Sequence, residues 1–518
     1  MTTIKILWAD DEIDLLRPHI LFLESRNYAV QACQSGADAL ECLESQLFDI
    51  VFLDENMPGL SGLETLDQIK TKYPDLPVVM ITKNEEESLM EEAIGQKIAD
   101  YLIKPLNPNQ ILLSLKKNLD NSRLVSEQVT SRYQKAFRDI AMEMMSIKTY
   151  QDWVALYQQL IYWELELENS QDQTLLEIMM SQKTEANLAF GKFIENNYPS
   201  WFKDPESGPV LSHQLFKKYI APELNKEQST LLIVIDNLRY DQWRVIAPLV
   251  GKHFAPRVEI PYFSILPTAT QYARNSFFSG LTPLEMKKKH PDLWKDDIDE
   301  GGKNLYEAEF LEAQFARLGL DRFSHCYNKI TNVKAAQKLA LQTSELANYD
   351  LNVIVYNFVD TLSHAKTEVE VIKELAADDK AYRSVTNSWF SNSPLLKIIQ
   401  QAQEMGIKLI LTTDHGTINV KHPSKLIGDR ETSINLRYKT GRSLTYNEKE
   451  AMVSKEPNSL GLPSLTMNSS FVFAKSDVFF VYPNNYNYFV NYYRNSFQHG
   501  GVSMEEMIVP LIIFDPKP

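Results

Sequence analysis

Seven residues that lie far apart in the sequence carry the side chains of a two-metal phosphoryl-transfer site. They are Asp236, Thr270, Asp360, His364, Asp414, His415 and His499. Together they supply three carboxylates, three imidazoles and one hydroxyl. Two neighbouring metal ions can stabilise the attacking and leaving oxygens of an in-line displacement, and a hydroxyl close to such an ion becomes a better nucleophile. Mixed oxygen and nitrogen ligands suit Zn²⁺, with Mn²⁺ as the alternative.

Each acidic member of this set closely follows an apolar run. The pairs are Leu231–Ile235 before Asp236, Val353–Phe358 before Asp360, and Lys408–Thr412 before Asp414. Such runs, separated by helical patterns, predict buried strands of an α/β sheet over about residues 226–518. Ligands bind beyond the carboxyl ends of strands in open α/β sheets, so residues that are distant in sequence can converge there.

A second acidic site is predicted near the start of the chain. The relevant residues at strand ends are Asp10 and Asp11 after Ile4–Ala9, Asp54 after Ile50–Leu53, Thr82 at the end of Val78–Thr82, and Lys104 after Ile98–Leu102. The alternation of these runs with helical patterns predicts a doubly wound parallel sheet over about residues 1–120. Clustered carboxylates bind Mg²⁺, which together with Lys104 can neutralise charge while a carboxylate accepts a phosphoryl group.

The segment between these two regions, about residues 121–225, shows helical patterns only. No Gly or Pro occurs from Asn109 to Phe190, and apolar residues recur at helical spacing. We therefore expect an all-helical connector, a small bundle. A length of 518 residues also favours about three domains.

Composition excludes some functions. The net charge of -15 argues against tight non-specific binding to duplex nucleic acid, and no helix-turn-helix pattern is evident at the C-terminus, so direct DNA binding is not expected. Cys33, Cys42 and Cys326 form no disulfide framework, which favours a reducing cytoplasm. We find no apolar stretch long enough to span a bilayer and no signal peptide pattern.

The first 120 residues resemble the receiver domains of two-component response regulators. The resemblance implies that Asp54 is the phosphoacceptor. It also assigns six residues to the Mg²⁺ site and to the switch, the set of residues that responds to phosphorylation. These residues are Asp10, Asp11, Asn56, Thr82, Tyr101 and Lys104. It also implies a cis peptide bond before Pro105. Lys83 departs from the family pattern, which commonly has a small residue here, and this leaves open the phosphoryl lifetime and the access of other proteins.

The segment Pro267-Thr268-Ala269-Thr270, followed by Asn275 and Ser279-Gly280, resembles the nucleophile motif of the alkaline phosphatase superfamily. The whole C-terminal segment resembles the PglZ branch of that superfamily. The resemblance implies that Thr270 is the nucleophile and that two Zn²⁺ ions are bound. One ion would be held by Asp360, His364 and His499, and the other by Asp236, Asp414, His415 and the oxygen of Thr270. A threonine nucleophile favours a phosphodiester substrate over a monoester.

A basic cluster near the C-terminus has two interpretations. Arg437, Lys439 and Arg442 could hold the phosphates of a nucleotide chain. Alternatively, they could form an exposed basic loop, since charged runs are usually solvated.

The order of receiver, helical connector and PglZ-type segment resembles response regulators associated with type IX secretion and gliding motility. This resemblance implies a cognate sensor histidine kinase, homodimerisation upon phosphorylation, and control through a sigma factor or a secretion component. It also implies a zinc-dependent phosphodiesterase that acts on oligonucleotides or cyclic nucleotides. The alternative is that the metal-stabilised C-terminal domain acts as a protein- or nucleotide-binding module with little catalysis.

Overall fold

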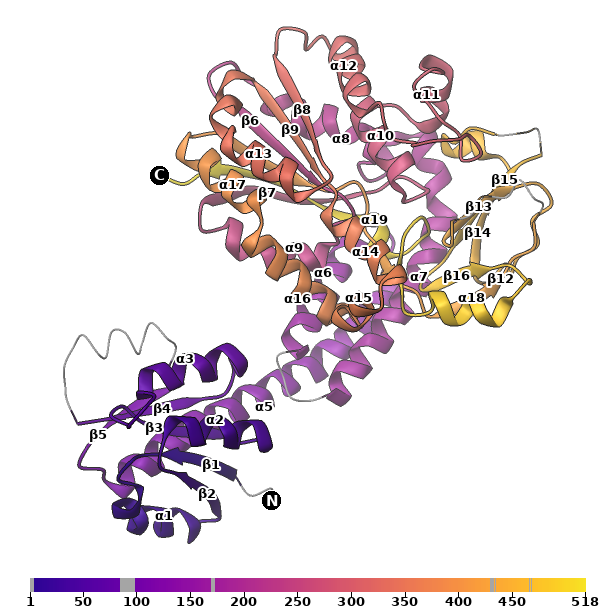
Figure 1. The fold of residues 1–518 in the computed structure, drawn as a ribbon. Coiled ribbons are helices and arrows are strands. Elements are labelled where there is room, and N and C mark those ends of the chain that lie inside the picture. The colour runs from indigo at the N-terminus through magenta and orange to yellow at the C-terminus, as the bar shows by residue number, and fades with distance from the viewer. Residues whose placement is uncertain are drawn as a thin grey trace. The chain divides into compact units, whose positions relative to one another are not determined.

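The computed structural model describes residues 4–83, 98–168, 173–428, 433, 435–464, 466 and 468–518. The chain divides into two compact units, of which the first runs to Lys135 and the second begins at Ala136 (Figure 1).

The first unit contains a five-stranded parallel sheet in the order β2-β1-β3-β4-β5. Its strands are β1 (Ile4–Ala9), β2 (Tyr28–Cys33), β3 (Ile50–Asp54), β4 (Val78–Thr82) and β5 (Asp100–Ile103). Its helices include α1 (Arg17–Glu24), α2 (Gly36–Ser45), α3 (Gly62–Lys72) and the start of α5 (Pro108–Ser146). Alternate residues of β1 enter two separate cores: Ile6 and Trp8 pack with α1 and α5, whereas Leu7 packs with α2 and α3. The sheet is therefore covered on both faces, as the near-continuous apolar strands require.

Helix α5 contributes residues to both units. No Gly or Pro interrupts the helix after its first residue, Pro108, which is a favourable position for proline in a helix. The domain boundary predicted near residue 120 thus falls inside a continuous helix.

The second unit contains a six-stranded sheet in the order β7-β18-β10-β6-β9-β8. The strands are β6 (Thr230–Ile235), β7 (Phe254–Phe263), β8 (His325–Ile330), β9 (Leu351–Tyr356), β10 (Lys408–Thr412) and β18 (Ile508–Pro516). β10, β6, β9 and β8 are parallel, and β18 and β7 extend the sheet in antiparallel fashion. Three neighbouring parallel strands, β10, β6 and β9, therefore end at the same edge, as the sequence predicts.

Helices surround this sheet, and three small sheets complete the unit (Figure 1). The helices are α6 (Tyr150–Glu168), α7 (Gln173–Lys203), α8 (Ser212–Leu215), α9 (Tyr240–Val250), α10 (Thr270–Ser279), α11 (Pro283–Lys289), α12 (Glu307–Leu318), α13 (Val333–Leu341), α14 (Phe358–Glu368), α15 (Glu370–Leu375), α16 (Asp379–Asn392), α17 (Pro394–Glu404), α18 (Tyr486–Tyr493) and α19 (Met504–Met507). The small sheets pair β11 (Ile418–Asn419) with β17 (Phe497–Gln498), β12 (His422–Lys425) with β16 (Val478–Val481), and β13 (Tyr438–Gly441) with β15 (Ser470–Ala474) and β14 (Ala451–Ser454).

The helices α6 and α7 belong to the same compact unit as the large sheet. Trp153 of α6 packs edge-on against Phe190 of α7, with ring centroids 5.3 Å apart. Phe190 and Trp201 of α7 both contact Phe263 at the end of β7, at 6.2 and 5.8 Å. Aromatic pairs of this kind add to the burial energy, so the helices are fixed on the sheet.

Buried ion pairs also join these helices to the rest of the unit. Glu164 of α6 accepts from Lys183 of α7 at 2.7 Å and from Arg383 of α16 at 2.8 Å. Arg383 also pairs with Asp241 of α9 at 2.5 Å, and Lys183 pairs with Glu505 of α19 at 3.2 Å. All five side chains are at least nine-tenths buried. A buried charge is tolerated only when it is paired, so the partners depend on one another.

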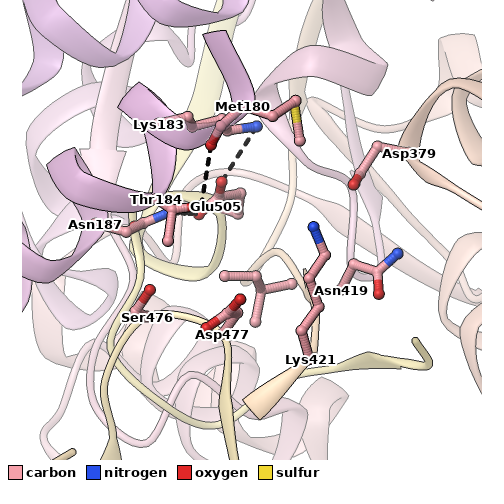
Figure 2. A pocket seen from close by; sticks show the side chains of 11 residues that line it. Met180, Lys183, Thr184, Asn187, Asp379, Asn419, Lys421, Ser476, Asp477 and Glu505 are labelled. Atoms are coloured by element: carbon pink, nitrogen blue, oxygen red, sulfur yellow. Dashed lines mark hydrogen bonds and ion pairs between the residues drawn. The ribbon is translucent and has the colours of Figure 1, made fainter. Parts of the chain in front are cut away.

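A polar pocket lies beside this network. Figure 2 shows Lys183 and Glu505 on one side of the pocket, with Asp379 and Asn419 on the other. None of the residues that sequence analysis assigned to a site lines it. In the described part of the chain, no helix combines the length and the apolar character that crossing a membrane requires.

The substitution Arg383→Met should destabilise the second unit by about 3–5 kcal/mol, because it leaves the buried carboxylates Glu164 and Asp241 without this partner. Urea-induced unfolding of the full chain, followed by tryptophan fluorescence, measures this change. The matched control is Lys289→Met, which removes an exposed pair with Glu285 and should change stability by less than about 0.5 kcal/mol. Equal unfolding midpoints for the two variants would contradict the role of the network.

Candidate active site

The first of two ligand clusters in the second unit consists of Asp360, His364 and His499, whose candidate ligand atoms all lie within 4.8 Å of one another. Asp360 lies in the first turn of α14 and His364 one turn later, so the two side chains share a helix face. His364 Nε2 is 3.5 Å and His499 Nε2 is 3.7 Å from Asp360 Oδ1. The strand predicted to run to Phe358 ends at Tyr356, since Phe358 already begins α14.

The second cluster consists of Asp236, Asp414 and His415, which are fully buried and equally close together. Asp236 directly follows β6 and Asp414 follows β10, two adjacent parallel strands in which Thr412 pairs with Val234. His415 Nε2 is 3.9 Å from Asp236 Oδ1 and 3.7 Å from Asp414 Oδ2. The backbone N–H of Asn237 donates to Asp414, although the two residues are 177 positions apart. The carboxyl ends of the strands thus bring together residues that are distant in the sequence.

Contacts between His415 and His499 join the two clusters. Their rings stack with centroids 4.4 Å apart and an interplanar angle of 23°. Asn237 Nδ2 donates to Asp360 Oδ1 at 3.4 Å, from the residue next to Asp236. The structure therefore places the two clusters side by side.

Thr270 lies at the first position of α10, with its hydroxyl facing the second cluster. Thr270 Oγ1 is 3.1 Å from His415 Nε2. His415 Nδ1 lies 3.0 Å from the carbonyl of Gly416, and His499 Nδ1 lies 3.2 Å from the carbonyl of Thr268. Because a carbonyl only accepts hydrogen bonds, both Nδ1 atoms carry the proton and both Nε2 atoms present a lone pair. This orientation is typical of histidines that bind metals.

The protonation of the site fits cation binding. Burial raises the pKa of Asp360 to about 6 and also raises that of Asp414. For Asp236 burial acts in the same direction, but Arg274 and His415 outweigh it and lower the pKa. Burial keeps the pKa of His499 well below its usual value, so the imidazole is neutral. A bound cation would favour the charged carboxylates and needs a neutral imidazole.

Two carboxylate oxygens point to the same conclusion. Asp236 Oδ1 and Asp414 Oδ2 are buried and have no hydrogen-bond partner among the described residues. An unsatisfied buried carboxylate oxygen is costly and indicates a group that the polypeptide itself does not supply. The donor set of both clusters therefore fits divalent metal ions.

Sequence reasoning missed two charged residues at this site, Arg274 and Glu307. Arg274 is fully buried, and its Nη1 lies 2.7 Å from Asp236 Oδ2. Its Nε lies 2.5 Å from Glu307 Oε1. Arg274 follows Thr270 by one helical turn, so the two residues share a helix face. This spacing could have indicated from the sequence that Arg274 lies at the site.

The first unit contains a separate acidic cluster of Asp10, Asp11 and Asp54. Asp10 and Asp54 are buried at the ends of β1 and β3, and Asp11 is exposed. Lys104 Nζ lies 2.8 Å from Asp54 Oδ1 and 2.9 Å from Asp10 Oδ2. Burial raises the pKa of Asp54, whereas Asp54 and Asp10 outweigh burial at Lys104 and raise its pKa. The three carboxylates and the ammonium group thus meet at one edge of the sheet.

The other residues predicted for this site lie around it. Thr82 Oγ1 donates to Glu55 Oε2 at 2.6 Å, and Asn56 and Tyr101 are exposed. The peptide bond between Lys104 and Pro105 is cis. Lys83, the departure from the receiver pattern, forms an exposed ion pair with Glu12 at 3.0 Å.

The basic cluster predicted to bind phosphates does not converge on the site. Arg437 is fully buried and pairs with Glu506 through Nη2 at 2.6 Å and Nε at 3.1 Å. Lys439 is 1% exposed and donates to the carbonyl of Ser433 at 2.8 Å. Neither side chain is therefore exposed for contact with a substrate in this structure, and the exposed-loop alternative does not describe them either, because both are bound inside the protein around β13. Arg442 follows β13 at an exposed position, and its role remains a prediction.

Comparison with known families covers most of the chain. Residues 6–116 match the response regulator receiver domain, residues 123–202 match the PorX response regulator linker domain, and residues 215–514 match the BREX system PglZ alkaline phosphatase-like domain. The last match spans more than half of the 518 residues, and the chain belongs to the PglZ family. It is a response regulator in which a receiver domain is combined with a phosphatase-like output domain. The predicted fold class is confirmed.

Individual relatives resemble the receiver segment. The alginate biosynthesis transcriptional regulatory protein AlgB of Pseudomonas putida is 36% identical over 120 residues, which are 23% of this chain and 27% of AlgB. ResD of Bacillus subtilis is 33% identical over 112 residues, which are 22% of this chain and 46% of ResD. The chain thus spans between a quarter and a half of these relatives. The receiver domain of NtrX from Brucella abortus is a solved structure with 30% identity and a TM-score of 0.22, covering 22% of this chain and 98% of that one.

The buried position of Lys439 gives a pH-dependent prediction. Burial lowers the pKa of Lys439 from 10.5 to about 7, so the unfolded chain takes up this proton before the folded chain as the pH falls. This group therefore makes the wild type less stable as the pH falls from about 10 to about 7 and has no further effect below that. As the pH falls over this range, the free energy of unfolding of Lys439→Met should rise relative to that of the wild type. Urea unfolding at several pH values measures this difference. Lys449→Met, at an exposed position, is the matched control, and a difference that is constant with pH would contradict the argument.

Proposed function

We propose that the C-terminal domain is a two-metal phosphodiesterase with Thr270 as its nucleophile. The observation that carries this proposal is the position of Thr270 Oγ1, 3.1 Å from His415 Nε2, beside two adjoining ligand clusters. The residues that would hold the two ions are Asp360, His364 and His499 for one, and Asp236, Asp414, His415 and the Thr270 oxygen for the other. Zn²⁺ suits this mixed set of oxygen and nitrogen donors, and Mn²⁺ is the alternative.

The residues of the chain have distinct parts in the reaction. Bound metal ions would lower the pKa of the Thr270 hydroxyl and neutralise charge on the phosphoryl oxygens. Thr270 forms the new bond to phosphorus while the bond to the leaving alcohol breaks, and the proton lost from the threonine hydroxyl is balanced by the proton that the leaving alcohol takes up. Water then hydrolyses the threonine ester, which releases a phosphate monoester and restores Thr270. The N-terminus of α10, where Thr270 lies, directs the positive end of the helix dipole toward the anionic group. The backbone carbonyls of Gly416 and Thr268 keep the two imidazoles oriented.

The substrate class follows from the nucleophile and from the resemblance to the PglZ family. Threonine in this position favours phosphodiesters, and we propose oligonucleotides or cyclic nucleotides as substrates. With Arg437 and Lys439 buried, the phosphates of the substrate must be held by other groups, namely the metal ions and the start of α10. Duplex DNA is an unsuitable partner for a chain with a net charge of -15.

The receiver domain implies a cognate sensor kinase. We propose that this histidine kinase phosphorylates Asp54, with Mg²⁺ held by Asp10, Asp11 and the backbone of Asn56. Lys104 then neutralises charge on the acquired phosphoryl group, and Thr82 and Tyr101 rearrange. We also propose homodimerisation on phosphorylation, and control of type IX secretion through a sigma factor or a secretion component in the cytoplasm, as the resemblance of the domain order to response regulators of that system implies. The match of residues 123–202 to the PorX response regulator linker domain agrees with that domain order.

Substitution of the nucleophile tests the catalytic proposal. Thr270→Val should lower the hydrolysis of a chromogenic phosphodiester by at least about 1,000-fold, because no hydroxyl remains to attack phosphorus. Steady-state rates of the zinc-loaded full chain measure this loss. Thr445→Val, at an exposed threonine, is the matched control and should retain full activity. Unchanged turnover in Thr270→Val would refute the assignment, and nucleotide binding without hydrolysis in the wild type would favour the binding-module alternative.

Substitution of the phosphoacceptor tests the input. Beryllium fluoride, which mimics a phosphoryl group on aspartate, should about double the sedimenting mass of the wild-type chain and leave Asp54→Asn monomeric, because the amide cannot hold the mimic. Sedimentation velocity with Mg²⁺ at several concentrations measures this. The control Asp67→Asn removes an exposed carboxylate on α3 and should behave as the wild type does. A wild-type mass that does not change with the mimic would count against phosphorylation-linked dimerisation.

A further inference from the structure

A buried guanidinium group contacts the carboxylates of the second ligand cluster. Arg274 lies on α10 one turn after Thr270, and none of its surface is exposed. Its Nη1 is 2.7 Å from Asp236 Oδ2 and 3.8 Å from Asp414 Oδ2. Asp236 Oδ2 is thereby occupied, and Asp236 Oδ1 faces His415 Nε2 at 3.9 Å. The arginine thus determines which oxygen of Asp236 is available within the cluster.

A second buried charge compensates the arginine. Glu307, at the start of α12, is 1% exposed, and its Oε1 lies 2.5 Å from Arg274 Nε. The other oxygen of Glu307 accepts from Lys329 at 2.8 Å and from the hydroxyl of Tyr327, both on β8. Glu307 is therefore held from two sides and fixes the plane of the guanidinium group.

The charges explain why both partners are needed. Asp236 and Asp414 are buried and close together, so their repulsion would turn the side chains apart unless a donor held them. An arginine without a counter-charge would place a full positive charge beside the cation site and weaken cation binding. Glu307 offsets the charge of Arg274 and so reduces that penalty, while the guanidinium group keeps its contact with Asp236.

We propose that Arg274 and Glu307 act as a positioning pair that holds Asp236 and Asp414 ready for the second metal ion. This inference rests on the proposed two-metal function. Removal of a partner that orients a metal-binding side chain commonly lowers the metal affinity about 10–100-fold. The effect should be confined to the cluster of Asp236, Asp414 and His415, since among the described residues the arginine forms no ion pair with the other cluster.

Calorimetric titration of the metal-free full chain with zinc, together with measured metal content, tests the proposal. Arg274→Lys keeps the charge but loses the planar fork of donors, and we expect the affinity for one of the two ions to fall about 10–100-fold while the other is unchanged. The double substitution Arg274→Met with Glu307→Gln removes both members of the pair, so Glu307 is not left as a buried charge without its arginine, and it should show the same selective loss. Arg322→Lys, at an exposed arginine, is the matched control.

The outcomes separate this inference from the function on which it rests. Two ions bound by Arg274→Lys and by the double variant with wild-type affinities would overturn the positioning role alone. Loss of both ions would assign the pair a merely structural role and would also overturn the positioning role. The same holds if the metal-free variants have a lower melting temperature and show no selective loss of one ion. A wild-type chain that takes up no zinc would overturn the proposed function and this inference together. Selective loss of one ion in the two Arg274 variants, with Arg322→Lys still binding two ions at wild-type affinities, would support it.

Discussion

Repulsion between buried carboxylates is the constraint on which the C-terminal unit depends. Asp236 and Asp414 follow the neighbouring parallel strands β6 and β10, and Asp360 lies in the first turn of the helix after β9, so the sheet brings the three carboxylates close together. Burial raises the pKa of Asp360 and Asp414, and the neighbouring charge of Asp236 raises both further. Positive charge must compensate the cluster, and Arg274 supplies only part of it at one carboxylate. Divalent ions would supply the remainder.

The same principle recurs in the receiver unit and in the helical segment. Lys104 compensates Asp10 and Asp54 at the end of the smaller sheet. The buried pairs of Glu164 with Arg383 and of Lys183 with Glu505 join helices α6 and α7 to α16 and α19 of the unit that carries the candidate active site. In each case an acidic group is retained in the interior because a specific cation is positioned next to it. The helices that follow the receiver are therefore attached by directional contacts as well as by apolar packing.

Much of this arrangement could be predicted because strand ends are readable from sequence. An apolar run followed by aspartate predicted where Asp236 and Asp414 would lie, and the parallel order of the sheet then brought them together. The burial of Arg437 could not be predicted, because its partner Glu506 lies 69 positions away and no local pattern links them. Glu307 was missed for the same reason, as it meets Arg274 across 33 positions. The predicted boundary near residue 120 gave no warning of the continuous helix α5, since helical periodicity does not mark where a domain ends.

The most direct test of the account is anomalous X-ray diffraction from crystals of the full chain grown with zinc, recorded on both sides of the zinc absorption edge. Two-metal catalysis predicts two peaks in the C-terminal unit, one among Asp360, His364 and His499 and one among Asp236, Asp414 and His415. A single peak, or peaks away from these side chains, would contradict it.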